Sequence, residues 1–212
     1  MTFAPALRRF TLTTHVTSSV GWVGAVLVFL ALAAIGLSSG DERTVRGAYL
    51  VMAPAAWFVL VPLAHATLFS GLALSLGTPW GLFRHYWVVL KLAITVFATV
   101  ILMIYMGTFR QMAGVAADPV VELGLVRNPS PFVHSILALI LLVAATILGI
   151  YKPFGLTPYG RRTPGASLPA VPSAQPIMAA TSRWPYVFGI LVIASLALFV
   201  IMHLTGAMPS GH

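Results

Sequence analysis

The sequence predicts an all-α membrane protein, a polytopic bundle with a four-helix core and a fifth transmembrane helix at its C-terminal end. Hydrophobic residues make up 59% of the 212 residues and charged residues only 8%, against about 25% in a soluble domain. The mean hydropathy is +0.96. The apolar residues gather into stretches long enough to cross a bilayer, which takes about 20 residues. These observations exclude a soluble globular fold.

The first apolar stretch covers about residues 12–37. It has one competing interpretation, a cleaved signal peptide with Arg8 and Arg9 before the apolar segment and Ala31–Ala33 as the cleavage site. The polar residues over 11–19 and the length of the run, which exceeds the usual 7 to 15 apolar residues of a signal peptide, favour a retained helix.

Three further spans complete the predicted core, residues 1–152. The second covers 48–76 and contains Pro54 and Pro62, which predict kinks or unwound turns. The third, 86–105, opens on cations and aromatic residues typical of a membrane interface. The fourth covers 131–151. No cysteine is present, which excludes disulfides, thiolate metal sites and covalent c-type haem.

The C-terminal part is predicted to differ from the core. Residues 153–185 are rich in Pro, Ala, Gly and Ser, so we expect a flexible or irregular cytoplasmic linker. Residues 186–212 carry the fifth span, over about 186–204, and a short tail on the outer side.

The cations predict the orientation. The net charge of +8 indicates a membrane topology signal rather than nucleic-acid binding. The side of the N-terminus carries Arg8, Arg9, Arg84, Lys152, Arg161, Arg162 and Arg183, and the other side carries Arg43, Arg46, Arg110 and Arg127. We expect a multi-pass protein of a bacterial plasma membrane, and the positive-inside rule places its N-terminus in the cytoplasm and its C-terminus outside.

Four of the six histidines, His15, His65, His134 and His203, lie in four different spans. Ionisable side chains are costly in a bilayer and usually face the bundle interior or a ligand. Their distances from the helix ends predict an inner pair, His15 with His65, and an outer pair, His134 with His203. Two such pairs would provide the axial ligands of b-type haems, which need no cysteine. The alternative is that each histidine is an interhelical hydrogen-bonding residue.

Two further observations concern the inner pair. Thr11, His15, Ser18 and Trp22 recur on one helical stripe, which predicts that this stripe faces inward. Arg84 and Lys91 fall seven residues apart on one face. They are predicted counter-charges for haem propionates or a lipid phosphate, whereas the alternative for Lys91 is that it snorkels to the interface.

Methionine suggests a different ligand. Apart from Met1 and Met178, every methionine maps to the outer side. Thioether and imidazole groups suit Cu(I), although methionine is also a common apolar filler. The alternative copper ligands are Met202, His203, Met208, Met103 and Met106.

Three segments carry a resemblance to a known family: Leu12–Ala25 (LTTHVTSSVGWVGA), Trp80–Lys91 (WGLFRHYWVVLK) and Tyr151–Pro153 (YKP). Over about residues 8–163 the chain resembles uncharacterised integral membrane proteins related to the copper-resistance-D-like four-helix group. That group includes haem-binding protoporphyrinogen oxidase-like members and copper-handling members. By position, only His15 matches its recurring first-helix histidine.

Three hypotheses follow. The first is a b-type haem protein in transmembrane electron transfer, a component of a membrane oxidoreductase that meets other membrane redox proteins or a second copy. The second is a copper-handling protein. The third is an accessory or scaffold subunit without a cofactor, packed through small residues such as Gly71 and Ser75. Because the four acids are all expected in outer loops, carboxylate chemistry within the membrane is not indicated.

Overall fold

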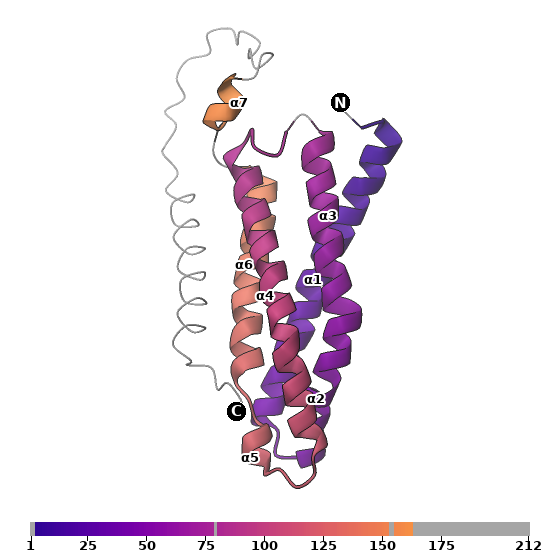
Figure 1. Ribbon diagram of the computed structural model, residues 1–212, viewed down its shortest axis with the longest axis vertical. Helices are drawn as coiled ribbons and strands as arrows, with labels where there is room; N and C mark the ends of the chain where they lie inside the picture. Colours follow the sequence, from indigo (N-terminus) through magenta and orange to yellow (C-terminus); the bar gives the residue numbers. More distant parts are fainter. Residues whose placement is uncertain (1–2, 79, 153–154, 163–212) are drawn as a thin grey trace.

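The computed structural model describes residues 3–78, 80–152 and 155–162 (Figure 1). The predicted fifth span and most of the predicted linker lie outside these residues. The described chain is an all-α bundle, as predicted. Its elements are α1 (Pro5–Ser38), α2 (Glu42–Ala55), η1 (Ala56–Leu60), α3 (Val61–Gly77), α4 (Tyr86–Ala117), α5 (Leu123–Val126), α6 (Ser130–Tyr151) and α7 (Pro158–Arg162).

Within the described residues, four long helical segments are apolar enough to cross a membrane: Pro5–Ser38, Glu42–Gly77, Tyr86–Ala117 and Leu123–Tyr151. The start of α1, the end of α3, the start of α4 and the end of α6 lie at one end of the bundle, which we call the N-terminal end, and α5 lies at the other (Figure 1). This up-and-down arrangement is the consequence of short connections between long helices.

The second span contains the unwound turn that its prolines predict. Between Pro54 and Pro62 the backbone widens into the π-helical turn η1. A proline lacks an N–H group and its ring crowds the preceding turn, so the helix cannot keep regular hydrogen bonds through both positions. The span nevertheless continues as α3 because neighbouring helices hold it on both sides of the turn.

Helix α4 is longer than predicted, since it continues to Ala117 instead of ending near Tyr105. The additional turns remain amphipathic, with Phe109, Met112 and Ala116 buried. Residues at this spacing share one helical face. The extension therefore follows from packing against α2, which the hydropathy of the segment does not reveal.

Close packing holds the core together. A Cβ atom at Gly36 would lie 2.9 Å from the ring of Tyr49, so α1 and α2 approach at a point where only glycine fits. The Tyr49 hydroxyl donates to the carbonyl of Asn128 at 3.0 Å and accepts from its N–H at 2.9 Å. Phe29 and Phe109 meet edge to face at 5.4 Å between centroids.

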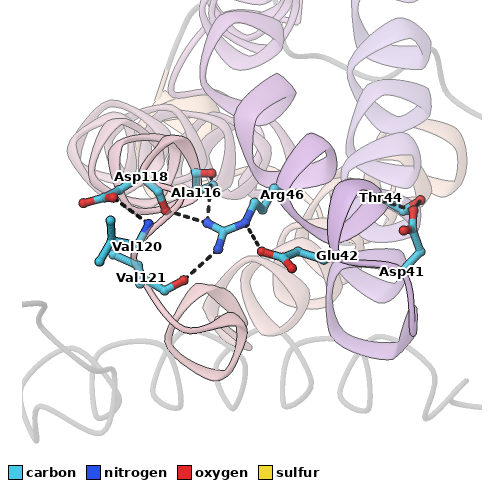
Figure 2. Close-up of polar contacts among 8 residues, drawn as sticks. All are labelled: Asp41, Glu42, Thr44, Arg46, Ala116, Asp118, Val120 and Val121. Atoms are coloured by element: carbon cyan, nitrogen blue, oxygen red, sulfur yellow. Dashed lines mark hydrogen bonds and ion pairs between the residues drawn. The ribbon is translucent and has the colours of Figure 1, made fainter.

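Arginines organise the end of the bundle that contains α5. The Arg46 guanidinium pairs with Glu42 at 2.8 Å and donates to the carbonyls of Asp118 and Val121, each at 2.7 Å (Figure 2). Arg127 donates to the carbonyls of Leu37 and Ser39. These carbonyls lie at or just beyond the C-terminal ends of α4 and α1, where helices leave acceptors unsatisfied. Both arginines therefore have a structural role.

Residues 155–162, the described part of the predicted linker, contain the short helix α7. Thr157 donates through its backbone N–H to the carbonyl of Arg84 at 2.9 Å, and its hydroxyl accepts from the N–H of Gly160 at 3.1 Å. The second contact caps α7, since a Thr hydroxyl satisfies a free N–H at a helix start. Residues 155–162 thus pack back on the loop before α4.

Candidate functional site: a cationic cavity around His15 and Lys91

A cavity of about 350 Å³ lies at the N-terminal end of the bundle, between α1, α3, α4 and α6. Most of its lining is apolar, including Leu12, Leu68 and Leu92. Three cationic side chains also line it: Arg8, Lys91 and Lys152.

None of the residues described as lining this cavity is acidic. The four acids of the chain, Asp41, Glu42, Asp118 and Glu122, belong to the other end, beside α2 and α5 (Figure 1). Positive charge in an apolar, partly enclosed cavity without carboxylates attracts anions.

His15 is the buried centre of the site. Its Nδ1 atom lies 3.1 Å from the carbonyl oxygen of Thr67 and 3.1 Å from the hydroxyl of Ser70. The Ser70 hydroxyl donates to the carbonyl of Ala66 at 2.5 Å, so it can only accept from the imidazole. Since both neighbours of Nδ1 are acceptors, Nδ1 carries the hydrogen and Nε2 has the free lone pair.

Lys91 approaches that lone pair. Its Nζ atom lies 3.1 Å from Nε2 of His15, and the lysine is the donor because an ammonium group can only donate. A doubly protonated imidazole would place two cations in direct contact, so His15 is neutral in this arrangement. The hydrogen bonds therefore form a chain that runs from the amine of Lys91 to the imidazole of His15 and from there to the acceptors on Thr67 and Ser70.

Two glycines leave room for this pair. A Cβ atom at Gly71 of α3 would lie 2.9 Å from Cε1 of His15, and one at Gly149 of α6 would lie 3.3 Å from Nζ of Lys91. Cβ contacts this short force a neighbour to move. The absence of side chains at these positions lets the imidazole and the amine enter the space between the helices.

The rim of the cavity includes three exposed side chains: Arg8, Trp80 and Lys152. Lys152 closes α6 in a left-handed conformation, with φ 45°, and its ammonium lies 4.6 Å from the centroid of the Trp80 ring. Trp80 also meets Trp87 at 5.6 Å between centroids. Cations and tryptophans together are typical of a membrane interface.

The structure does not bring His65 to this cavity. His65 lies two residues before Thr67 on α3, so the two are at similar heights along the bundle. His65 is half-buried, and its Nδ1 atom lies 2.8 Å from the carbonyl oxygen of Val61 in its own helix. Its ring contacts that of Phe69. Phe69 is 62% exposed, so this face of α3 points away from the bundle. Arg84 is likewise absent from the lining; its carbonyl accepts from Thr157.

His134 lies at a second and smaller cavity of about 80 Å³, nearer the opposite end. Its Nδ1 atom lies 2.8 Å from the carbonyl of Ser130, and its ring stacks on Tyr105 at 4.1 Å between centroids. The Tyr105 and Ser130 hydroxyls are 2.7 Å apart. His203, the predicted partner of His134, lies outside the described residues.

The methionines predicted as copper ligands fall into two groups. Met106 is buried in the apolar core and Met103 packs against it. Met202 and Met208, with His203, lie outside the described residues. In the part of the chain that the structure describes, no group of three or more His, Cys, Asp or Glu side chains could hold a metal ion.

Several residues of the site were not found by sequence reasoning. Arg8 and Lys152 were assigned only to orientation, and Thr67 and Ser70 were not singled out. Gly71 was singled out for packing against a partner protein, whereas in the structure it faces His15. A signal was present, because Ser70 and Gly71 follow Thr67 at three and four positions, so these small or polar residues share one face of the helix.

Comparisons with known proteins identified no relative: no family model, no curated protein and no solved structure matches the chain. The interpretation of the cavity therefore depends on its own chemistry.

Proposed function

We propose that this integral membrane protein binds an amphipathic anion in the cavity around His15 and Lys91. One observation carries the proposal: among the residues that the structure describes, three cations and no carboxylate line an apolar cavity within a helical bundle that is apolar enough for a membrane. A carboxylate or phosphate would meet Arg8 and Lys152 at the rim, while its apolar part would lie against the leucines. Charge-assisted hydrogen bonds of this kind are about twice as strong as neutral ones.

Haem b is the member of this ligand class to which the sequence points, because it combines an apolar ring with two carboxylates. The chemistry of His15 supports it, since metal-ligating histidines usually donate their second N–H to a fixed acceptor, as Nδ1 of His15 does to Thr67. The hydrogen bond from Lys91 to Nε2 of His15 would have to break, because Nε2 is the atom that would bind the haem iron. When bound, haem would supply one-electron redox chemistry.

The geometry supports a single haem more than the two bis-histidine haems that the sequence suggests. His65 does not line the cavity, so His15 is the one histidine among its described lining residues. The cavity at His134 is less than a quarter as large. Electron transfer across the membrane would therefore need a partner redox protein or residues outside the described part of the chain.

Ligand binding to the purified protein in detergent tests the proposal. Tryptophan fluorescence is suited to it, because Trp80 and Trp87 line the cavity. We expect saturable quenching by haemin and by iron-free protoporphyrin IX, which both carry two carboxylates, and weak quenching by the protoporphyrin dimethyl ester, which carries none.

Variants locate the anion. Arg8→Gln and Lys152→Gln should each weaken binding about tenfold, the effect of one charged hydrogen bond of about 1.4 kcal/mol. Arg9→Gln is the matched control, since Arg9 is adjacent but does not line the cavity. Equal binding of the acid and its ester, or no effect of the rim variants, would overturn the proposal. Tighter binding of haemin than of iron-free porphyrin, lost in His15→Gln but not in His65→Gln, would establish ligation of the iron.

A further inference from the structure

Lys91 occupies an unusual position for a lysine in a membrane protein. In the described part of the chain its amine has no carboxylate partner, and its hydrogen bond goes to the uncharged nitrogen of His15. A snorkelling lysine, which is the alternative that the sequence left open, would instead extend its ammonium to water. Lys91 is half-buried and lies beside the cavity.

The arrangement is that of an activated nucleophile. A nucleophile and a base lie within hydrogen-bond reach, and a third group orients the base. Here the amine of Lys91 is 3.1 Å from Nε2 of His15, and Nδ1 of His15 is held 3.1 Å from the carbonyl of Thr67. Because Nδ1 already carries a hydrogen, Nε2 is free to take a proton from the amine.

The surroundings provide space beside the amine for an apolar reactant. Gly149 has no side chain where a Cβ would lie 3.3 Å from Nζ, and Leu68, Val88 and Leu92 line the same cavity. An aldehyde dissolved in the bilayer carries an apolar chain that suits such walls. With its chain against these walls, the aldehyde would place its carbonyl carbon beside Nζ of Lys91, the nucleophile.

We propose that Lys91 captures apolar aldehydes or ketones from the bilayer as an imine, with His15 as its base. The Lys91 ammonium gives one proton to Nε2, and the freed lone pair attacks the carbonyl carbon. A second proton moves from Nζ to the carbonyl oxygen, which gives the neutral carbinolamine. The protonated His15 then donates its proton to the carbinolamine hydroxyl, which leaves as water while the C=N bond forms. One ammonium and one aldehyde give one protonated imine and one water, so no oxidant or reductant is needed.

The chain is well suited to a trapping experiment because it contains only two lysines, Lys91 and Lys152. Lys152 is exposed and serves as the internal control. The full-length protein in detergent is incubated with a small excess of hexadecanal, and sodium cyanoborohydride reduces any imine to a stable secondary amine. Mass spectrometry of the intact protein and of its peptides then locates the alkyl group.

We expect the label on Lys91 to exceed that on Lys152 and on the N-terminal amine by at least tenfold in the wild type. Lys91→Met should remove it, and Arg9→Gln, at a residue that does not line the cavity, should leave it unchanged. His15→Gln keeps an amide near the lysine but removes the base, so its labelling of Lys91 should fall at least tenfold. Label distributed equally between the lysines, or unaffected by His15→Gln, would overturn the inference.

This inference concerns the same cavity as the proposed function but does not depend on its anion site, because hexadecanal carries no charge. Two separate measurements on the wild type distinguish them. Quenching by porphyrin reports the anion site, and the labelling of Lys91 reports the imine. If the wild type does not bind porphyrin but Lys91 is labelled, only the anion proposal is rejected. If the wild type binds porphyrin but Lys91 is not labelled, only the imine proposal is rejected.

Discussion

The Nζ atom of Lys91 lies 3.1 Å from the Nε2 atom of His15, although the two residues are 76 positions apart in the chain. One comes from α4 and the other from α1. The contact forms at the depth where α3 presents Thr67, Ser70 and the side-chain-free Gly71 to the imidazole. The predictions below concern this contact and the interactions that hold the four helices around it.

Replacing Gly71 with alanine should damage the site directly. The new Cβ would lie 2.9 Å from Cε1 of His15, so the imidazole or α3 must shift, at a cost of about 1–3 kcal/mol. We expect a lower midpoint of thermal unfolding and reduced labelling of Lys91. Gly24→Ala is the matched control on α1, since its Cβ would meet nothing within 4 Å. A Gly71→Ala protein as stable and as reactive as the control would contradict the packing described here.

Arg46 should be essential to the end of the bundle that contains α5. Its side chain is only 13% exposed, and it bridges Glu42 to two carbonyls after α4. Arg46→Met leaves those acceptors unsatisfied, and hydrogen bonds to charged groups contribute about 1.5–3 kcal/mol. Thermal unfolding in detergent should show the loss, whereas Arg110→Met, at an exposed position of α4, should change the midpoint little. Equal midpoints for the two variants would refute the role given to Arg46.

Tyr49→Phe tests a single buried hydroxyl. The hydroxyl satisfies both the N–H and the carbonyl of Asn128, which fixes the chain before α6. Its removal leaves two backbone groups without this partner, and we expect a loss of about 1–3 kcal/mol in the free energy of unfolding. Tyr86→Phe, at a residue 46% exposed, is the control. The prediction fails if both substitutions have the same small effect.

Asp41 should give a pH-dependent contribution outside the membrane. Hydrogen bonds from the side chain and backbone of Thr44 lower the pKa of its carboxyl group below the usual 3.8, and the same contacts cap α2. A group with a lowered folded pKa stabilises the protein above its unfolded pKa, and this contribution is lost as the pH falls through the folded value. Asp41→Ala should therefore lower the unfolding midpoint at pH 7.

The difference between wild type and Asp41→Ala should shrink as the pH falls below about 4. Glu122→Ala is the control, because Glu122 precedes α5 without a side-chain capping bond. A constant difference across this pH range would show that the charge of Asp41 does not matter to the cap.

The helices were predictable from the sequence to the extent that hydropathy determines them. The apolar runs give α1, α3, α4 and α6, and the proline pair gives the unwound turn at η1. The inward stripe of α1 was also correct, since His15, Ser18 and Trp22 are buried. Polar residues in an apolar helix identify its inner face because lipid does not hydrate them.

The rotation of the other helices was not predictable. His65 has the depth expected of it, yet one face of α3 turns Thr67 and Ser70 inward and leaves His65 beside the exposed Phe69. In a membrane both faces of a helix are apolar, so hydropathy does not tell which one packs. The contact of Lys91 with His15 depends on the rotation of two helices and on the space at Gly71 and Gly149, which only the fold reveals.

Analysis of the ligand that co-purifies with the protein tests the central claim most directly. Wild type and the Arg8→Gln, Lys152→Gln double variant would be purified in mild detergent from haem-replete cells. Both samples would be measured by native mass spectrometry, visible spectroscopy before and after dithionite, and total iron and copper. The account predicts one amphipathic anion per wild-type protein that is lost from the double variant, with a b-type spectrum if that anion is haem. Wild-type protein without a bound anion, or identical ligands in both samples, would contradict it.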